Sequence, residues 1–308
     1  MPYDNLRKKT FILGVGAQKA GTSWLYEYLK SSPEITMSPL KEVHYFDTKF
    51  SPDMCLVFNR IFLRRLQERA GELLSQNTTG EDDPLFQALL DRVAMSARDR
   101  AYLDHFSRII DSKASHFGEI TPTYALLGED GYREIKKMAQ DNDLNLKVIF
   151  LLRDPVGRHL SNLRNQAKKH KKFNARKEFN ASLELESYTL RSSYDQTMTS
   201  LLNVFDAKDV HFEFYENLFN GASIRRICDF LGVEYREAEF DRKVNPSTSA
   251  KIQFTDDEIV KLYKKYEHIY EFCGSYFGDL LPDSWLKSSD ISKLSSSTPR
   301  FWEKFTSR

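Results

Sequence analysis

Cysteine is scarce in this sequence of 308 residues, which contains only Cys55, Cys228 and Cys273. The three are far apart and form no Cys-x-x-Cys pair, which argues against a disulfide framework or a zinc site and favours reduced thiols in a cytoplasmic protein. The seven histidines lack metal-ligand spacing, so we expect no metal. No apolar run approaches the roughly 20 residues of a membrane span, and the polar N-terminal segment does not resemble a signal peptide.

An excess of charge of one sign is also missing, because 45 basic residues face 44 acidic ones and the net charge is +1. This balance argues against a nucleic-acid partner, so affinity for anions must come from local clusters. With 41% hydrophobic residues, the chain is long enough for a single domain, 1–308, with a substantial core. Its oligomeric state cannot be predicted from the sequence.

Apolar runs that each lead into an amphipathic segment predict an α/β fold. Strands that alternate with helices indicate a central, mostly parallel sheet covered on both faces, the P-loop-type three-layer arrangement. The predicted strands are 11–16 (FILGVG), 147–152 (KVIFLL) and 210–215 (VHFEFY), and the predicted helices are 22–32, 155–166, 223–231 and 256–277.

Two segments fall outside this alternation. Residues 52–112 are rich in Leu, Arg, Glu and Asp and predict a helical insertion, interrupted by a loop at 75–84. It can form a lid or a wall of a substrate site, or a surface helical pair without contact to substrate. The serine-rich tail at 288–308 is expected to be loosely ordered, although Phe301, Trp302 and Phe305 can dock back.

The segment 14–25 (GVGAQKAGTSWL) predicts an anion site, because a strand that feeds a tight loop and a helix N-terminus presents free backbone N–H groups. Lys19 adds a charge, and Thr22 and Ser23 add hydroxyls. In nucleoside-triphosphatase loops the lysine directly precedes Ser or Thr, and here Gly21 holds that position. The plainer alternative is a glycine-rich turn with a surface lysine.

Two further segments carry chemistry. Arg153 follows the second predicted strand, where a guanidinium can bind phosphate with a forked pair of hydrogen bonds, and Ser161 lies on the helix that follows. In 41–47 (KEVHYFD), Lys41, Glu42 and His44 stand among aromatic residues. Aromatic walls predict a raised pKa for Glu42, which suits a general base, whereas a solvated Lys-Glu pair is the alternative.

Together these motifs resemble sulfotransferases that use 3′-phosphoadenosine-5′-phosphosulfate (PAPS), and the Lys-Glu-x-His-x-Phe-Asp segment resembles the carbohydrate (heparan-type) and bacterial members. The resemblance implies that the 5′-phosphosulfate loop contacts the donor and that Trp24 packs near the adenine, unless Trp24 is a core aromatic. The donor contacts implied for the loop are Lys19, Ala20, Gly21, Thr22 and Ser23.

The resemblance also implies a 3′-phosphate site at Arg153 and Ser161, and Tyr215, in a Tyr-Glu-x-Leu turn, near the adenine. The basic loop 242–251 lies where the family closes over this phosphate, but it lacks the Lys-Gly-x-x-Gly pattern. Which of its residues contact nucleotide therefore stays open.

For catalysis, the resemblance implies Glu42 as the base, Lys41 as a helper for charge and His44 as a second contact. Lys19 is expected to stabilise the departing 3′-phosphoadenosine-5′-phosphate. Residues 118–124 (GEITPTY) resemble a loop that lines the acceptor cleft, with Ile120 in place of a lysine. The implied acceptor is a hydroxyl of a saccharide or glycolipid, with a small alcohol, a lipid or a tyrosine as alternatives. The implied reaction is in-line sulfuryl transfer.

Two other functions remain open at this point. A P-loop nucleotide-dependent kinase would need magnesium and a lysine at position 21, and a non-catalytic nucleotide-binding module would tolerate replacement of Lys19 and Glu42. Basic residues near 168–172 can attract an anionic acceptor or a lipid headgroup, or can simply end a solvated helix.

Overall fold

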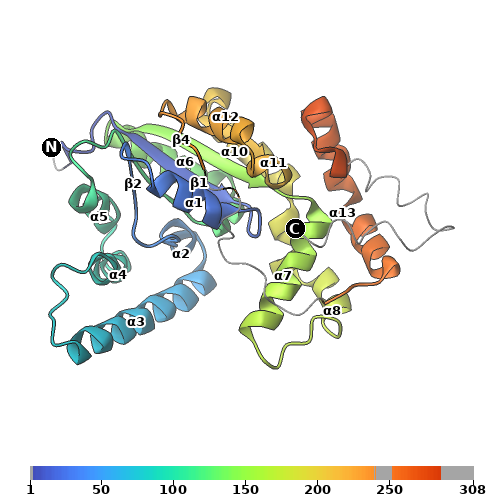
Figure 1. Ribbon diagram of the computed structural model, residues 1–308, viewed down its shortest axis with the longest axis horizontal. Helices are drawn as coiled ribbons and strands as arrows, with labels where there is room; N and C mark the ends of the chain where they lie inside the picture. The colour runs from blue at the N-terminus through green and yellow to red at the C-terminus, as the bar shows by residue number, and fades with distance from the viewer. Residues whose placement is uncertain (1–2, 239, 241–251, 286–308) are drawn as a thin grey trace.

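The computed structural model describes residues 3–238, 240 and 252–285, in which five strands form one parallel sheet in the order β2-β3-β1-β4-β5 (Figure 1). The predicted basic loop at 242–251 and tail at 288–308 lie outside the described residues. The strands are β1 (Thr10–Gly16), β2 (Ile35–Met37), β3 (His116–Ile120), β4 (Asn145–Leu152) and β5 (Val210–Phe214).

Helices fill the connections between strands and extend beyond them. The α-helices are α1 (Thr22–Lys30), α2 (Phe46–Phe50), α3 (Pro52–Ser75), α4 (Pro84–Ala94), α5 (Ala101–Ile109), α6 (Gly128–Asp141), α7 (Pro155–Lys169), α8 (Phe179–Glu184), α9 (Glu186–Thr189), α10 (Tyr194–Val204), α11 (Tyr215–Leu218), α12 (Gly221–Leu231) and α13 (Asp256–Phe277). Within the described residues the 3₁₀ turns are η1 (Pro122–Leu126), η2 (Leu190–Ser192), η3 (Ala207–Asp209) and η4 (Gly278–Leu280).

The predicted α/β fold is confirmed, and the sheet is parallel throughout the described residues. The three predicted strands correspond to β1, β4 and β5. The prediction missed β2 and β3, because β2 has only three residues and β3 (HFGEI) contains polar side chains.

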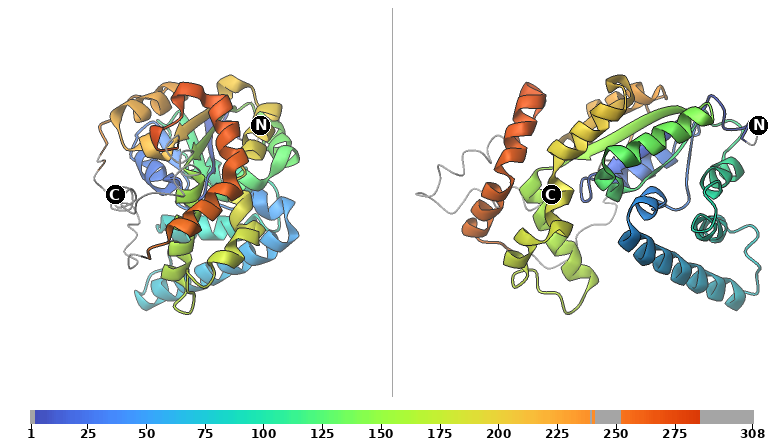
Figure 2. Two further views of the ribbon diagram at one scale, coloured as in Figure 1. Left: turned by 90° about the vertical axis from the view of Figure 1, so that its right-hand side faces the viewer. Right: turned by 180° about the vertical axis from the view of Figure 1, so that it is seen from behind.

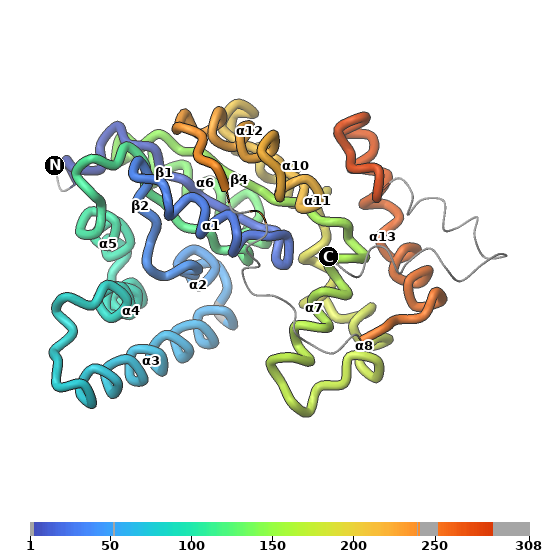
Figure 3. Tube along the Cα trace, in the orientation of Figure 1, coloured from blue at the N-terminus to red at the C-terminus, as the bar shows by residue number. Residues whose placement is uncertain are grey.

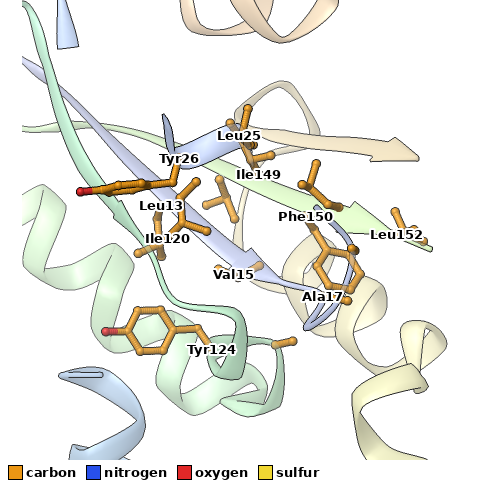
Figure 4. Packing of buried hydrophobic residues seen from close by; sticks show 14 of the residues in the cluster. Leu13, Val15, Ala17, Leu25, Tyr26, Ile120, Tyr124, Ile149, Phe150 and Leu152 are labelled. Atoms are coloured by element: carbon orange, nitrogen blue, oxygen red, sulfur yellow. The ribbon is translucent and has the colours of Figure 1, made fainter. Parts of the chain in front are cut away.

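Helices cover both faces of the sheet and give three layers. Helices α1 and α12 lie over one face, and α6 and α10 lie over the other, as the two additional views make clear (Figure 2). Because both faces are covered, the central strands are apolar along their length. Leu13 and Val15 of β1 pack beside Ile149 and Phe150 of β4 in the interior (Figure 4).

Helices α3, α4 and α5 occupy the segment predicted to be a helical insertion, and the predicted break at 75–84 separates α3 from α4. The chain leaves the sheet after β2, runs out through α3 and returns through α4 and α5 to β3 (Figure 3). Asp83 begins α4 by accepting a hydrogen bond from the Phe86 N–H at 2.6 Å, and Pro84 suits the first turn.

Candidate active site

The predicted site segments all follow the carboxyl ends of strands. In a parallel sheet these ends meet at one edge, which is where α/β proteins bind their ligands. The 17–21 loop follows β1, Arg153 follows β4 and Tyr215 follows β5, while the 41–47 segment lies beyond β2. The fold therefore brings together motifs that are more than 100 residues apart in the sequence.

Hydrogen bonding joins the first loop to the second motif. Nη1 of Arg153 donates to the Lys19 carbonyl at 2.8 Å, and its guanidinium lies 4.1 Å from the centre of the Tyr215 ring. Gly21 has φ of 84°, and a Cβ there would lie 2.7 Å from Cδ2 of Leu218. Glycine at this position thus allows the loop to pack against α11, so three predicted cofactor-binding segments are in contact.

Positive charge accumulates around Lys19. Burial lowers the pKa of Lys19 to about 8, and the charges of Arg153, Lys169, Lys168 and Lys41 add to the shift. Cations that depress one another's pKa are arranged for an anion that would relieve their repulsion. The predicted 5′ loop and the basic end of α7 thus contribute to one electropositive region.

The remaining predicted cofactor contacts differ in accessibility. Thr22 and Ala20 are buried, whereas Ser23 and Ser161 are partly exposed. Trp24 is 6% exposed and stacks between Tyr28 and Phe240 at centroid distances of 5.8 Å. The side chain of Trp24 therefore belongs to an aromatic cluster of the core, and its predicted adenine contact stays a prediction.

The 41–47 segment forms a chain of charged contacts. Nζ of Lys41 donates to Oε1 of Glu42 at 2.6 Å, and Nε2 of His44 lies 3.3 Å from Oε2 of the same carboxylate. On the other side, Nδ1 of His44 lies 2.7 Å from Oδ2 of Asp47. The imidazole therefore bridges two carboxylates, an arrangement in which its protonated form donates to both.

The expected rise in the pKa of Glu42 is wrong. Burial does oppose ionisation of this carboxyl, but the hydrogen bond from His44 and the charges of Lys41 and His44 outweigh it, and the pKa falls to about 2. The same bridge acts on His44: burial lowers its pKa, but the hydrogen bonds to Asp47 and Glu42 reverse the effect and leave the pKa raised. Glu42 is thus ionised at neutral pH.

A hollow of ≈ 220 Å³ opens beside Glu42. One side of it is polar and comes from the 41–44 segment, and the other side comes from α3. The lining residues are Lys41, Glu42, His44, Phe58, Ile61, Phe62 and Arg65. The Glu42 side chain, 40% exposed, is accessible to a molecule that enters this hollow.

Helix α4 holds the 41–47 segment in place through Arg92, which is 1% exposed. Nε of Arg92 donates to the Val43 carbonyl at 2.6 Å, Nη2 donates to the His44 carbonyl at 3.0 Å, and Nη1 donates to Asn59 of α3 at 3.1 Å. His44 adopts a left-handed φ of 54°, which costs energy for a residue with a side chain. The buried guanidinium stabilises this backbone conformation.

Beneath the segment lies Glu119, a fully buried carboxyl. It accepts hydrogen bonds from Tyr102 of α5 at 2.6 Å, from Tyr124 at 3.0 Å and from the Val43 N–H at 3.1 Å, and Thr121 also donates to it. Burial raises the pKa of Glu119, although these hydrogen bonds oppose the shift.

The prediction that 118–124 is a loop is wrong, because Gly118, Glu119 and Ile120 complete β3 and only the residues after them leave the sheet. Glu119 and Ile120 are buried, so these two side chains face no open cleft. The hydroxyls of Thr121 and Tyr124 accept hydrogen bonds from the Val43 and Tyr45 N–H groups at 2.9 Å, and Thr123 contacts the pair formed by His44 and Asp47. The Thr123 hydroxyl donates to Oδ2 of Asp47 at 2.5 Å and lies 3.2 Å from Nδ1 of His44.

Sequence reasoning assigned no role to Asp47, Thr123, Arg92 or Arg191. Asp47 and Thr123 do lie inside motifs that the sequence analysis quoted, so their positions carried a signal. Arg92 and Arg191 carried none. Nε and Nη1 of Arg191, in η2, are buried without a hydrogen-bond partner among the described residues, and η2 packs against η1, which carries Thr123. A metal was not expected, and the described residues contain no cluster of His, Cys, Asp and Glu able to hold one.

A three-layer fold that gathers cations and an ionised carboxylate at the carboxyl edge of its sheet is typical of enzymes that transfer a group from a phosphorylated donor. The chain belongs to the sulfotransferase domain family, whose model matches residues 8–267. This confirms the resemblance to PAPS-dependent sulfotransferases. Among the described residues, no helix is both long and apolar enough to cross a membrane.

A solved structure shares the fold of this chain. A sulfotransferase from Alicyclobacillus acidocaldarius has a TM-score of 0.59 and 19% identity, with 91% of this chain and 99% of that chain covered. This similarity shows a shared fold. The sulfotransferase domain of the Synechococcus PCC 7002 olefin synthase is more distant, with a TM-score of 0.43, 18% identity and coverage of 96% and 98%. No curated protein sequence matches the chain.

Proposed function

We propose that this sulfotransferase uses PAPS as its donor and transfers the sulfuryl group to a hydroxyl, with Glu42 as the base. One observation carries the proposal: Lys41 connects the two halves of the site. Its ammonium hydrogen-bonds to Glu42 and its charge acts on Lys19 of the anion loop. A donor phosphate at Lys19 and an acceptor hydroxyl at Glu42 would then be neighbours.

Donor binding follows from the cations at the edge of the sheet. The 5′-phosphosulfate lies at Lys19, at the hydroxyls of Thr22 and Ser23, and at the backbone of Ala20 and Gly21, where the N-terminus of α1 adds positive potential.

The rest of the nucleotide extends toward the second motif. Within the described residues only Nη1 of the Arg153 guanidinium hydrogen-bonds to protein, so its other N–H groups can bind the 3′-phosphate together with Ser161. Tyr215, in contact with Arg153, lies next to the adenine.

The transfer is a single in-line displacement. The acceptor oxygen forms a bond to sulfur while the bond from sulfur to the 5′-phosphate oxygen breaks, and that electron pair leaves with 3′-phosphoadenosine-5′-phosphate (PAP). The acceptor proton passes to the Glu42 carboxylate. Lys19 stabilises the charge that develops on the leaving phosphate, and Lys41 stabilises charge between the two sites.

A pKa of about 2 makes the Glu42 carboxylate a weak base, but it keeps the carboxylate free to accept a proton at every physiological pH. His44 orients this carboxylate through the contact of 3.3 Å and is itself held by Asp47. The acceptor belongs to the hydroxyl class that the sequence predicted, a saccharide, a glycolipid or a small alcohol.

The two competing functions fit these residues less well. A kinase of the P-loop type would need a lysine where Gly21 stands, and that position has a left-handed φ of 84° and close contacts that disfavour any side chain. A non-catalytic binding module gives no reason for the ordered chain from Lys41 through Glu42 and His44 to Asp47. A single domain at 1–308 and a cytoplasmic location remain predictions from the sequence.

Replacement of Glu42 by Gln tests the proposal. The amide cannot take the acceptor proton, so turnover should fall by at least about 100-fold, the usual range for general base catalysis. PAP binding, measured by calorimetry, should stay within about twofold, because Glu42 lies outside the anion loop. Loss of PAP binding or retained turnover would each contradict the assignment of Glu42, and Glu27→Gln, at an exposed position on α1, is the matched control.

A further inference from the structure

The hollow beside Glu42 has walls of opposite character. On one side, Lys41, Glu42 and His44 present charged and hydrogen-bonding groups. The other side is formed by α3, whose aromatic residues Phe58 and Phe62 line the hollow. Phe58 stacks on the His44 ring at a centroid distance of 3.6 Å, so this wall begins directly at the catalytic segment.

The α3 wall is an apolar strip in which Phe58 and Ile61 are partly exposed, whereas Phe62 is only 1% exposed. Phe58, Ile61 and Phe62 stand at positions i, i+3 and i+4 of one helix, and such positions share a face. Their side chains offer neither donors nor acceptors. A bare saccharide on this strip would lose hydrogen bonds from its hydroxyl groups, at about 1–3 kcal/mol for each buried group. The strip therefore selects against a strongly polar occupant.

The strip ends at Arg65, seven positions after Phe58 and thus on the same face of α3. Its guanidinium lies 5.2 Å from the centre of the Phe62 ring, and no carboxylate among the described residues forms an ion pair with it. The neighbouring Arg64 is different, since its side chain is 70% exposed and pairs with Glu68. Arg65 thus lies at the end of the apolar surface with no carboxylate at ion-pair distance among the described residues. Burial lowers its pKa, and the charges of Glu42 and Glu68 act on it from farther away and oppose that shift.

We propose that the acceptor is an amphiphilic alcohol that carries an anionic group. Its hydroxyl lies at Glu42, its apolar segment lies along Phe58 and Ile61, and its carboxylate or phosphate binds Arg65, which follows Phe58 by about 10 Å along α3. This inference rests on the proposed function of Glu42 and narrows its acceptor class to a lipid-like molecule. It also gives the helical insertion a role, because α3 then forms a wall of the acceptor site and is not merely a surface helix.

The test compares three acceptors with PAPS as donor, and PAP release is the readout. They are ω-hydroxydecanoate, its uncharged methyl ester, and methyl β-galactoside. The wild-type enzyme should use the two lipid-like alcohols in preference to the glycoside and should favour the acid over the ester. Arg65→Gln should raise KM for the acid by at least about tenfold, the value of one charge-assisted hydrogen bond. For the ester, KM should change less than about twofold.

Arg64→Gln is the matched control. It should leave KM for the acid and KM for the ester unchanged, because Arg64 is exposed and does not line the hollow. Ile61→Ser should lower kcat/KM for acid and ester alike, because it places a hydroxyl on the apolar strip. Calorimetry with PAP in each variant separates this inference from the proposed function. A KM for the acid that is the same in Arg65→Gln as in the wild type, a preference for the glycoside, or PAP binding without turnover of either alcohol would each contradict the amphiphilic acceptor. Failure to bind PAP would contradict the proposed function instead.

Discussion

Replacement of Arg92 should separate catalysis from nucleotide binding. This buried side chain donates to the carbonyls of Val43 and His44 and lies on α4, away from the anion loop. An aliphatic residue would leave both carbonyls without that donor, at about 1–3 kcal/mol for each. The total cost of about 2–6 kcal/mol is large against a typical stability of about 5–15 kcal/mol, so Arg92→Leu is expected to fold poorly.

Arg92→Lys is the informative variant. It keeps the charge but offers a single ammonium in place of a fork, so one of the two carbonyls loses its donor, at about 1–3 kcal/mol. The free energy of unfolding in urea should fall by that amount. Because Glu42 and His44 would no longer be held firmly, kcat should fall by about 100-fold, the effect of a misplacement of about 1 Å.

The dissociation constant of PAP and the KM for PAPS should stay within about twofold in this variant, because Arg92 contacts no residue of the 17–21 loop. A general loss of structure would instead weaken nucleotide binding together with kcat. Arg64→Lys, at an exposed position on α3, is the control and should leave every parameter unchanged. Wild-type kcat in Arg92→Lys, or a parallel loss of PAP affinity, would refute the positioning role of Arg92.

Two further variants test the electrostatics of the site. Because the pKa of Lys19 lies near 8, PAP affinity should weaken by up to about tenfold from about pH 7 to about pH 9 as the ammonium deprotonates. Lys19→Arg should remove this dependence, because arginine stays charged over this range. If calorimetric titrations of Lys19→Arg show the same change of PAP affinity with pH as the wild type, Lys19 is not its source. Asp47→Asn should lower the pKa of His44 in an NMR titration of the imidazole, because one of the hydrogen bonds that raise this pKa is weakened. The stability that His44 adds is present below its ordinary pKa of about 6.5 and is lost as pH rises through the raised value, so the variant should lose stability mainly on the acid side. An imidazole midpoint equal to that of the wild type would contradict the bridge.

The parts of the fold that could be predicted from the sequence are the buried strands that consist of continuous apolar runs. Strands β1, β4 and β5 are such runs, and the helices after them have clear amphipathic spacing. Strand β3 was missed because His116 and Glu119 interrupt its apolar pattern. Both are buried nonetheless, since His116 hydrogen-bonds to the Leu231 carbonyl at 2.8 Å and Glu119 is surrounded by donors. Partners from distant segments made these polar residues compatible with a buried strand.

In the candidate site, too, the sequence identified residues that lie in compact motifs but not the properties that depend on tertiary contacts. Lys19 and Glu42 could be identified because they lie in compact motifs, but the pKa of Glu42 depends on where Lys41 and His44 point, which spacing does not determine. The aromatic neighbours suggested a raised pKa, whereas direct contacts with two cationic groups lower it. Arg92 could not be found at all, because one arginine in an amphipathic helix resembles a surface residue until its buried hydrogen bonds are known.

The most direct test of the account is a calorimetric titration of the wild-type chain with PAP, compared with ATP plus magnesium and with AMP. The cations around Lys19 and Arg153 predict selective binding of PAP, because it alone of the three nucleotides carries both a 3′- and a 5′-phosphate. The selectivity should disappear in Arg153→Ala. Preference for ATP with magnesium, or no binding of PAP, would contradict the proposal that this enzyme takes its sulfuryl group from PAPS.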